Sequence, residues 1–242
     1  MPLRVTNVRL PVTLDEEHIG PELARRLAVD LDDLAGWRIL KKSLDGRSRN
    51  NLKFVYSVAV EVVDEENRLE ELARREGVDR YLATTFDDPV PGSVPLEERP
   101  VVIGSGPAGM LAAYFLATRG YRPLILERGP AVKDRVSSIR KFDSGGEHDP
   151  DDNYLFGEGG AGTFSDGKLT CRLSGPDIDW VLQRFAEFSR QPSVAWEQRP
   201  HLGSNRLPFV VRNFRQEIEA AGGEYRFGCR FEGLEIENGQ LV

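Results

Sequence analysis

The chain has 242 residues, of which 40% are hydrophobic and 29% charged, so its composition is that of a globular protein and excludes a disordered or fibrous one. Its 32 basic and 39 acidic residues give a formal net charge of -7, which excludes a general attraction for nucleic acid or anionic membranes. Cys171 and Cys229 stand outside any CxxC or Cys/His spacing, so we predict neither a disulfide framework nor a metal site. We recognise no signal peptide and no apolar run near the roughly 20 residues that cross a bilayer, and we expect a cytoplasmic protein without a membrane partner.

Residues 1–86 are predicted to form a small α+β domain. In chain order the predicted elements are a strand from Leu3, a helix with Leu23, Leu27, Leu31 and Leu34 on one face, strands at residues 37–40 and 53–63, a helix at residues 67–76 and a strand at residues 81–86. This β-α-β-β-α-β order indicates a ferredoxin-like fold. Many unrelated functions share that topology, so it does not identify an activity.

A basic segment lies between the second and third predicted strands. Its cations are Lys41, Lys42, Arg47, Arg49 and Lys53, and Asp45 is the only acidic residue among them. Clustered cations neutralise phosphates, so one interpretation is a loop that binds an anion or RNA. The other is a solvated hairpin tip that turns at residues 45–46. We favour the hairpin tip, because no aromatic residues interleave with the charges as they usually do in proteins that bind single strands.

Residues 87–99 are predicted to be a linker. The segment DDPVPGSVPLEER contains three prolines and a glycine and has no apolar periodicity. We therefore divide the chain into a ferredoxin-like domain at residues 1–86, a linker at residues 87–99 and an α/β domain at residues 100–242. The oligomeric state is not predicted.

The segment VVIGSGPAGM opens the second domain with glycines at the spacing GxGxxG. It follows a predicted strand and precedes a predicted helix that ends near Gly120, and a second strand then ends at Glu127. In such a Rossmann-type unit Gly104 allows a sharp turn, Gly106 lets the backbone approach a pyrophosphate, and Gly109 lets the helix pack closely on the sheet. The phosphates would lie at the helix N-terminus, and Glu127 would accept hydrogen bonds from the adenosine ribose. The unit alone does not distinguish FAD from NAD.

A second glycine-rich segment, YLFGEGGAGTFSDGKL, occupies residues 154–169. Its many glycines indicate a backbone that closely approaches a ligand or another segment, and its polar side chains suit a phosphate, a ribityl chain or a flavin edge. A flexible exposed loop is the alternative. The apolar residues within the segment argue against full exposure.

Together the two segments resemble the FAD-dependent oxidoreductases of the glutathione-reductase-like superfamily. They are most similar to bacterial FAD-dependent dehydrogenases that carry a small domain ahead of the flavin domain. The resemblance implies FAD as the cofactor and an adenine contact near the end of a strand at residues 225–231. The cofactor-binding residues that it implies are Gly104, Ser105, Gly106, Pro107, Ala108, Gly109, Glu127, Arg128, Gly159, Gly160, Thr163, Ser165, Lys168 and Phe231.

The function that we predict is an FAD-dependent oxidoreductase that transfers hydride or electrons between FAD and a small molecule, with NAD(P)H as a candidate electron source. We expect Lys168, or main-chain N–H groups at residues 160–163, to stabilise reduced flavin. The sequence identifies no catalytic acid or base and no substrate. The alternative is a flavin-binding or RNA-associated module in which the flavin is not catalytic. A nucleic acid partner is disfavoured, because no aromatic residues interleave with the charges of the basic segment.

The last elements expected are helices around residues 177–189 and 209–221, the strand at residues 225–231, and a further strand near residues 234–236. Asn238 and Gly239 form a hairpin signal, but only three residues follow them. We therefore expect the FAD-binding domain to be incomplete at its C-terminus. Cys229 is expected to be a packed strand residue.

Overall fold

The computed structural model describes residues 2–63, 66–171, 173–237 and 240–241. The chain forms two compact units. Unit 1 comprises Met1–Asp87 together with Arg172–Asp179 and Ser193–Pro200, and unit 2 comprises Asp88–Cys171, Trp180–Pro192 and His201–Val242. The predicted domains are continuous in sequence, whereas unit 1 also contains these two later segments.

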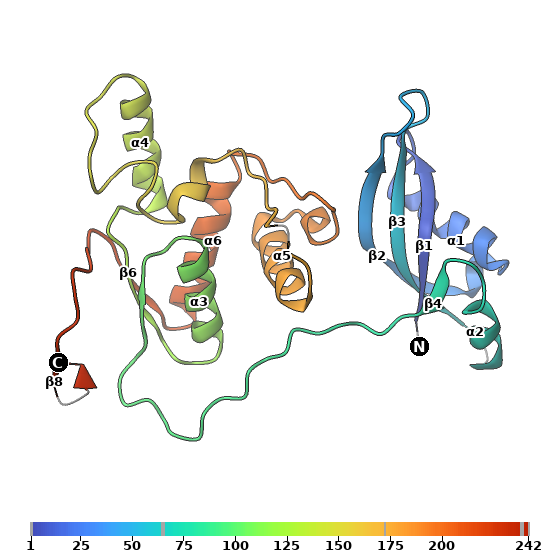
Figure 1. Cartoon of the computed structure of the whole chain (residues 1–242), viewed down its shortest axis with the longest axis horizontal. Helices are drawn as coiled ribbons and strands as arrows, with labels where there is room; N and C mark the ends of the chain where they lie inside the picture. The colour runs from blue at the N-terminus through green and yellow to red at the C-terminus, as the bar shows by residue number, and fades with distance from the viewer. Residues whose placement is uncertain (1, 64–65, 172, 238–239, 242) are drawn as a thin grey trace. The chain divides into compact units, whose positions relative to one another are not determined.

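Unit 1 is built on a four-stranded antiparallel sheet in the order β2-β3-β1-β4 (Figure 1). Its elements are β1 (Leu3–Pro11), α1 (Ile19–Leu27), β2 (Leu34–Asp45), β3 (Lys53–Val62), α2 (Glu66–Leu72) and β4 (Val78–Arg80), with short 3-10 turns at Glu16–His18 and Leu31–Asp33. Alternate residues of β1 and β3 point to one face and form a buried cluster with Leu23, Leu27 and Leu72 of the helices. One sheet face covered by two helices is therefore the core of this unit.

Several predicted elements of unit 1 are wrong in extent. The first helix ends at Leu27 rather than continuing to Leu34, because Ala28 adopts a left-handed conformation with φ of 48° and Asp30 begins a new turn. Leu34 instead starts β2, which is longer than the predicted strand at residues 37–40. The last strand is at Val78–Arg80, and residues 81–86 are not in a strand.

Residues 196–198 of unit 1 lie along the outer edge of β2. The N–H of Lys42 donates to the carbonyl of Trp196 at 2.8 Å, and the N–H of Gln198 donates to the carbonyl of Lys42 at 2.9 Å. These two bonds form a parallel bridge to an edge strand. A distant part of the sequence therefore covers part of the β2 edge.

Unit 2 contains a three-stranded parallel sheet in the order β5-β6-β7. Its elements are β5 (Val101–Ile103), α3 (Pro107–Thr118), β6 (Leu124–Leu126), α4 (Val132–Asp143), the 3-10 segments η3 (Gly160–Phe164) and η4 (Pro192–Ala195), α5 (Pro176–Ser189), α6 (Leu207–Ala220), β7 (Glu224–Arg226), β8 (Ile236–Glu237) and β9 (Gln240–Leu241). The first residues of α5 and most of η4 belong to unit 1. The predicted strand, helix and strand around the GxGxxG spacing are confirmed.

Aromatic side chains join α3 to the later helices of unit 2. The Tyr114 ring lies edge-on to Phe188 at 5.5 Å and to Phe214 at 5.6 Å between centroids, and such pairs add to the stability gained from burial. These contacts fix α3 against α5 and α6.

The predicted strand at residues 225–231 ends early, at Arg226. Gly228 has φ of 65°, and the next N–H, of Cys229, donates to the carbonyl of Glu127 at 2.9 Å. Cys229 and Phe231 are therefore not in the strand. The predicted turn at Asn238 and Gly239 lies outside the described residues, between β8 and β9. No helix in the described part of the chain has the length and apolar character needed to cross a membrane.

Candidate dinucleotide site

The first glycine loop, residues 104–106, connects β5 to α3. Gly104 has φ of 84°, and Gly106 precedes Pro107 at the first helical position. A Cβ on Gly109 would lie 2.0 Å from the Gly104 carbonyl oxygen, so only glycine fits there. Within the described residues the N–H groups of Gly106, Ala108 and Gly109 have no protein acceptor. The start of α3 is thus a site with free donors and a favourable dipole for an anion.

Glu127 follows β6 and lies beneath this loop, with only 5% of its surface exposed. One carboxylate oxygen accepts from the N–H and hydroxyl of Ser105 at 2.7 and 2.8 Å. The other accepts from the N–H groups of Gly129 and Gly157, both at 2.9 Å. Burial alone raises the pKa of Glu127, but these four donors outweigh it and hold the pKa below its usual value. We call this arrangement the Glu127 clamp.

The second glycine loop, residues 153–164, folds against the first. A Cβ on Gly160 would lie 3.1 Å from the Gly106 Cα, and the N–H of Gly159 donates to the Ser105 carbonyl at 2.9 Å. The N–H groups of Glu158 and Gly160 bond to the carbonyls of Pro130 and Gly157. With Gly157 bound to the Glu127 clamp, four consecutive N–H groups of this loop have protein acceptors. They hold the loop rather than a ligand.

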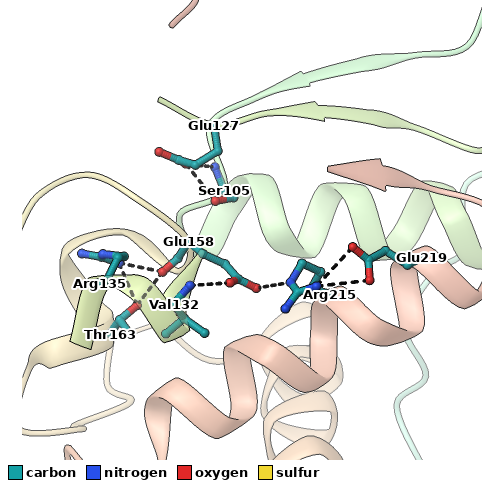
Figure 2. A network of polar contacts seen from close by, with 8 residues as sticks. All are labelled: Ser105, Glu127, Val132, Arg135, Glu158, Thr163, Arg215 and Glu219. Carbon is teal, nitrogen blue, oxygen red and sulfur yellow. Dashed lines mark hydrogen bonds and ion pairs between the residues drawn. The ribbon is translucent and has the colours of Figure 1, made fainter. Parts of the chain in front are cut away.

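A buried ion pair anchors the same loop to α6, as Figure 2 shows. Glu158 is 1% exposed; its carboxylate accepts from the Val132 N–H at 2.6 Å and from Arg215 Nε at 2.9 Å. Arg215 also reaches Glu219 one turn along α6 at 3.3 Å. Since an unpaired buried charge costs several kcal/mol, Arg215 fixes Glu158 in place.

Arg135 of α4 is fully buried on the other side of the loop (Figure 2). Its guanidinium donates to main-chain carbonyls, including those of Glu158 at 2.6 Å and Gly160 at 3.0 Å. Burial lowers the pKa of Arg135, and the carboxylates of Glu127, Asp152 and Glu158 oppose that effect. An arginine remains charged under such conditions, so a cation lies beneath the second glycine loop.

A pocket of about 260 Å³ opens between the two glycine loops. Its lining includes the predicted site residues Gly104, Gly106, Glu127, Arg128, Gly160 and Phe231. It also includes residues that the sequence analysis missed: Ile103, Leu126, Leu155, Phe156, Gly157 and Cys229. Leu155 and Phe156 lay within the glycine-rich segment, and their apolar character was the available signal. Cys229 reaches the pocket because the chain turns after β7.

The other predicted site residues divide into buried supports and exposed groups. Ser105, Gly159 and Thr163 are buried, and Thr163 Oγ1 donates to the Glu158 carbonyl at 3.3 Å. Pro107 and Ala108 are exposed at the start of α3, beside Gly109. Ser165 and Lys168 are exposed and do not line this pocket; Lys168 pairs with Asp166 at 2.7 Å.

Arg128 lies at the pocket edge with its guanidinium 4.0 Å from the Phe156 ring centre. Its Nε is 3.7 Å from Oδ1 of Asp151. A planar cation stacked on an aromatic ring at the mouth of the pocket can contact an anionic or aromatic group.

Comparison with known proteins gives two family matches. Residues 102–162 match the NAD(P)-binding Rossmann-like domain family. This range covers the first glycine loop and all but the last two residues of the second. Residues 2–61 match a domain of unknown function, DUF8436. Over 241 residues, all of this chain, it is 33% identical to an uncharacterized protein of Clostridium beijerinckii. Over 80 residues, 33% of this chain, it is 35% identical to an L-amino-acid oxidase of Sistrurus catenatus edwardsii. The chain spans 45% of the first relative and 15% of the second.

Proposed function

We propose that this chain carries the FAD-binding site of an FAD-dependent oxidoreductase that exchanges hydride or electrons with a small molecule. The observation that carries the proposal is the contact of the second glycine loop with Gly106 beside the free N–H groups of α3. The match to a Rossmann-like dinucleotide-binding family supports a dinucleotide, and the similarity to an amino-acid oxidase supports redox chemistry. The oxidase similarity covers too little of that enzyme to indicate its substrate here.

The residues present fit the FAD pyrophosphate and adenosine. The N–H groups of Gly106, Ala108 and Gly109 would hold the pyrophosphate, because they are donors at a helix N-terminus without protein acceptors. Leu155, Phe156 and Phe231 give the pocket an apolar lining suited to an adenine ring. When bound, the flavin supplies the hydride or electron transfer, and the protein supplies binding and orientation.

Glu127 has two proposed parts in that site. Its four protein donors fill about the four acceptor positions that a carboxylate offers, so the Glu127 clamp first joins the loops that form the pocket. A hydrogen bond from the adenosine ribose, as the sequence suggests, would replace one of these donors. The Ser105 hydroxyl is the donor that can rotate away without leaving a main-chain N–H unpaired.

Spectroscopy of the intact protein tests the proposal. We expect the purified protein to be yellow, to release FAD on denaturation, and to lose its visible absorbance when a suitable reductant such as NADH or NADPH is added. Replacing Lys168 with Met then tests whether this lysine stabilises reduced flavin, since the flavin reduction potential should fall. A colourless protein that takes up no FAD on reconstitution would refute the proposed function.

The alternative of a nucleic-acid module gains no support from the basic segment. Lys42 pairs with Glu16 at 2.5 Å, and Arg47 pairs with Asp45 at 2.6 Å. Two of the five cations of the basic segment thus already have counter-charges. We also propose that unit 1 is ferredoxin-like, since its sheet order and two helices match the order of elements in that fold.

A further inference from the structure

Arg135 lies in a cage of main-chain carbonyls. Nη1 donates to Glu158 at 2.6 Å and to Gly160 at 3.0 Å, and Nη2 donates to Asn153 and Tyr154, both at 3.3 Å. The Phe164 ring centre is 4.9 Å from the guanidinium carbon. Among the described residues no carboxylate forms an ion pair with Arg135. The carbonyl oxygens of the second glycine loop are therefore the close acceptors of this buried cation, and the carboxylates of Glu127, Asp152 and Glu158 act on its charge from farther away.

We infer that Arg135 is a positioning residue for the dinucleotide pocket. It turns the carbonyl groups of the second glycine loop away from the bound cofactor. The inference rests on the proposed function. The loop lies between Arg135 and the pocket, since Gly157 and Gly160 line the pocket while the Gly160 carbonyl bonds to the guanidinium. A carbonyl oxygen turned into the pocket would present negative charge to the phosphates of a dinucleotide.

The opposite edge of the loop is fixed by other groups. Glu127 and the Ser105 carbonyl accept from the N–H groups of Gly157 and Gly159, so they set the donors of the loop but not its acceptors. Arg135 bonds four of the loop's acceptors, the carbonyls of residues 153, 154, 158 and 160; the Thr163 hydroxyl also donates to the Glu158 carbonyl, at 3.3 Å. The approach of Arg135 is close enough that a Cβ on Gly157 would lie 2.4 Å from Arg135 Cδ. This contact, with φ of 102°, explains a glycine at position 157.

The geometry requires arginine rather than any cation. A guanidinium is a planar group with several N–H donors that point in different directions, whereas an ammonium is a compact point charge. Two nitrogens of Arg135 reach carbonyls on two separated parts of the loop, residues 153–154 and 158–160. A lysine would keep the charge but could not bond both parts. The Arg135→Lys variant therefore separates the shape of the group from its charge.

The experiment compares the intact wild type with Arg135→Lys, Arg135→Ala and the control Arg140→Ala, which removes an exposed arginine of the same helix. FAD affinity is measured by flavin fluorescence, and amide hydrogen exchange is measured across residues 153–164 without cofactor. We expect both Arg135 variants to bind FAD about 10- to 100-fold more weakly, the equivalent of one lost charge-assisted hydrogen bond, and to exchange faster in this segment. The control should match wild type in both measurements.

Guanidinium ion supplies a second readout. Millimolar guanidinium chloride should restore FAD affinity and slow exchange in Arg135→Ala, while sodium chloride at equal ionic strength should not. Wild-type affinity and exchange in Arg135→Lys would overturn the inference, even if Arg135→Ala fails to fold. A wild type that binds no FAD would instead refute the proposed function, and the exchange rates without cofactor would still show whether Arg135 positions the loop.

Discussion

Replacement of Glu127 by glutamine tests the Glu127 clamp with little change in shape. The carboxylate accepts four hydrogen bonds, three of them from main-chain N–H groups, and is almost fully buried. A glutamine has one acceptor oxygen and one donor nitrogen in the same space. If its oxygen keeps Gly129 and Gly157, its nitrogen faces the N–H of Ser105, which loses its acceptor. The opposite orientation would leave two N–H groups without acceptors.

The cost follows from the better of these orientations. One buried N–H without an acceptor costs about 1–3 kcal/mol, and the remaining hydrogen bonds become weaker because the acceptor is no longer charged. Relief from burying a carboxylate offsets part of this loss. We therefore expect Glu127→Gln to lower the free energy of unfolding by about 2–4 kcal/mol near neutral pH. Ser105→Ala, which removes only the hydroxyl donor, should cost about 1 kcal/mol.

Urea unfolding at several pH values measures both the size and the sign of the effect. The folded-state pKa of Glu127 is depressed, so its stabilisation is present above the unfolded pKa, about 4.3 for a glutamate, and is lost as the pH falls through the folded value. The difference between wild type and Glu127→Gln should therefore shrink below about pH 4.3. Equal stability of the two proteins at pH 7 would refute the clamp, and a difference that stays constant down to pH 2 would refute its ionic character.

Two further substitutions, each with a control variant, test the packing of unit 2 by thermal unfolding. Alanine for glycine inside a helix usually stabilises by about 0.5–1 kcal/mol, but Gly109→Ala places a Cβ 2.0 Å from a main-chain oxygen and should destabilise by about 1–3 kcal/mol or more. Gly162→Ala, with no atom within 4 Å of its Cβ, should change stability by less than about 0.5 kcal/mol, and a stabilised Gly109→Ala would contradict the contact. Arg215→Met leaves the buried Glu158 charge unpaired and should cost about 3–5 kcal/mol, whereas Glu219→Gln at the exposed end should cost at most about 1 kcal/mol. Similar costs for these two variants would argue against the buried pair.

The sequence predicted the local parts of the site and missed those that depend on distant contacts. The turn at Gly104 and the close packing at Gly109 follow from the spacing of a strand, a glycine turn and a helix, which is a short-range pattern. Arg135 carried no such signal, because an arginine on a helix usually faces solvent. Its burial depends on the path of residues 153–164, which is set by hydrogen bonds to Pro130, Ser105 and Glu127.

The lengths of the elements in unit 1 were predicted less well for a similar reason. The leucines at 23, 27, 31 and 34 continue a helical spacing past the point where the helix ends, so periodicity alone overestimates its length. The left-handed Ala28 that ends it is not a residue type that marks a helix end. The order of strands and helices was nevertheless predicted, because each core face has its own period.

The pairing of β2 with residues 196–198 sets an order of events during translation. A nascent chain that has reached Asp87 contains every strand of the N-terminal sheet but not the segment that bonds to the β2 edge at Lys42. Until that segment leaves the ribosome, the main-chain groups of Lys42 at this edge are open to pairing with a neighbouring chain. A gene fragment that stops at Asp87 would keep that edge permanently open, so a fragment meant to reproduce unit 1 needs the later segments as well.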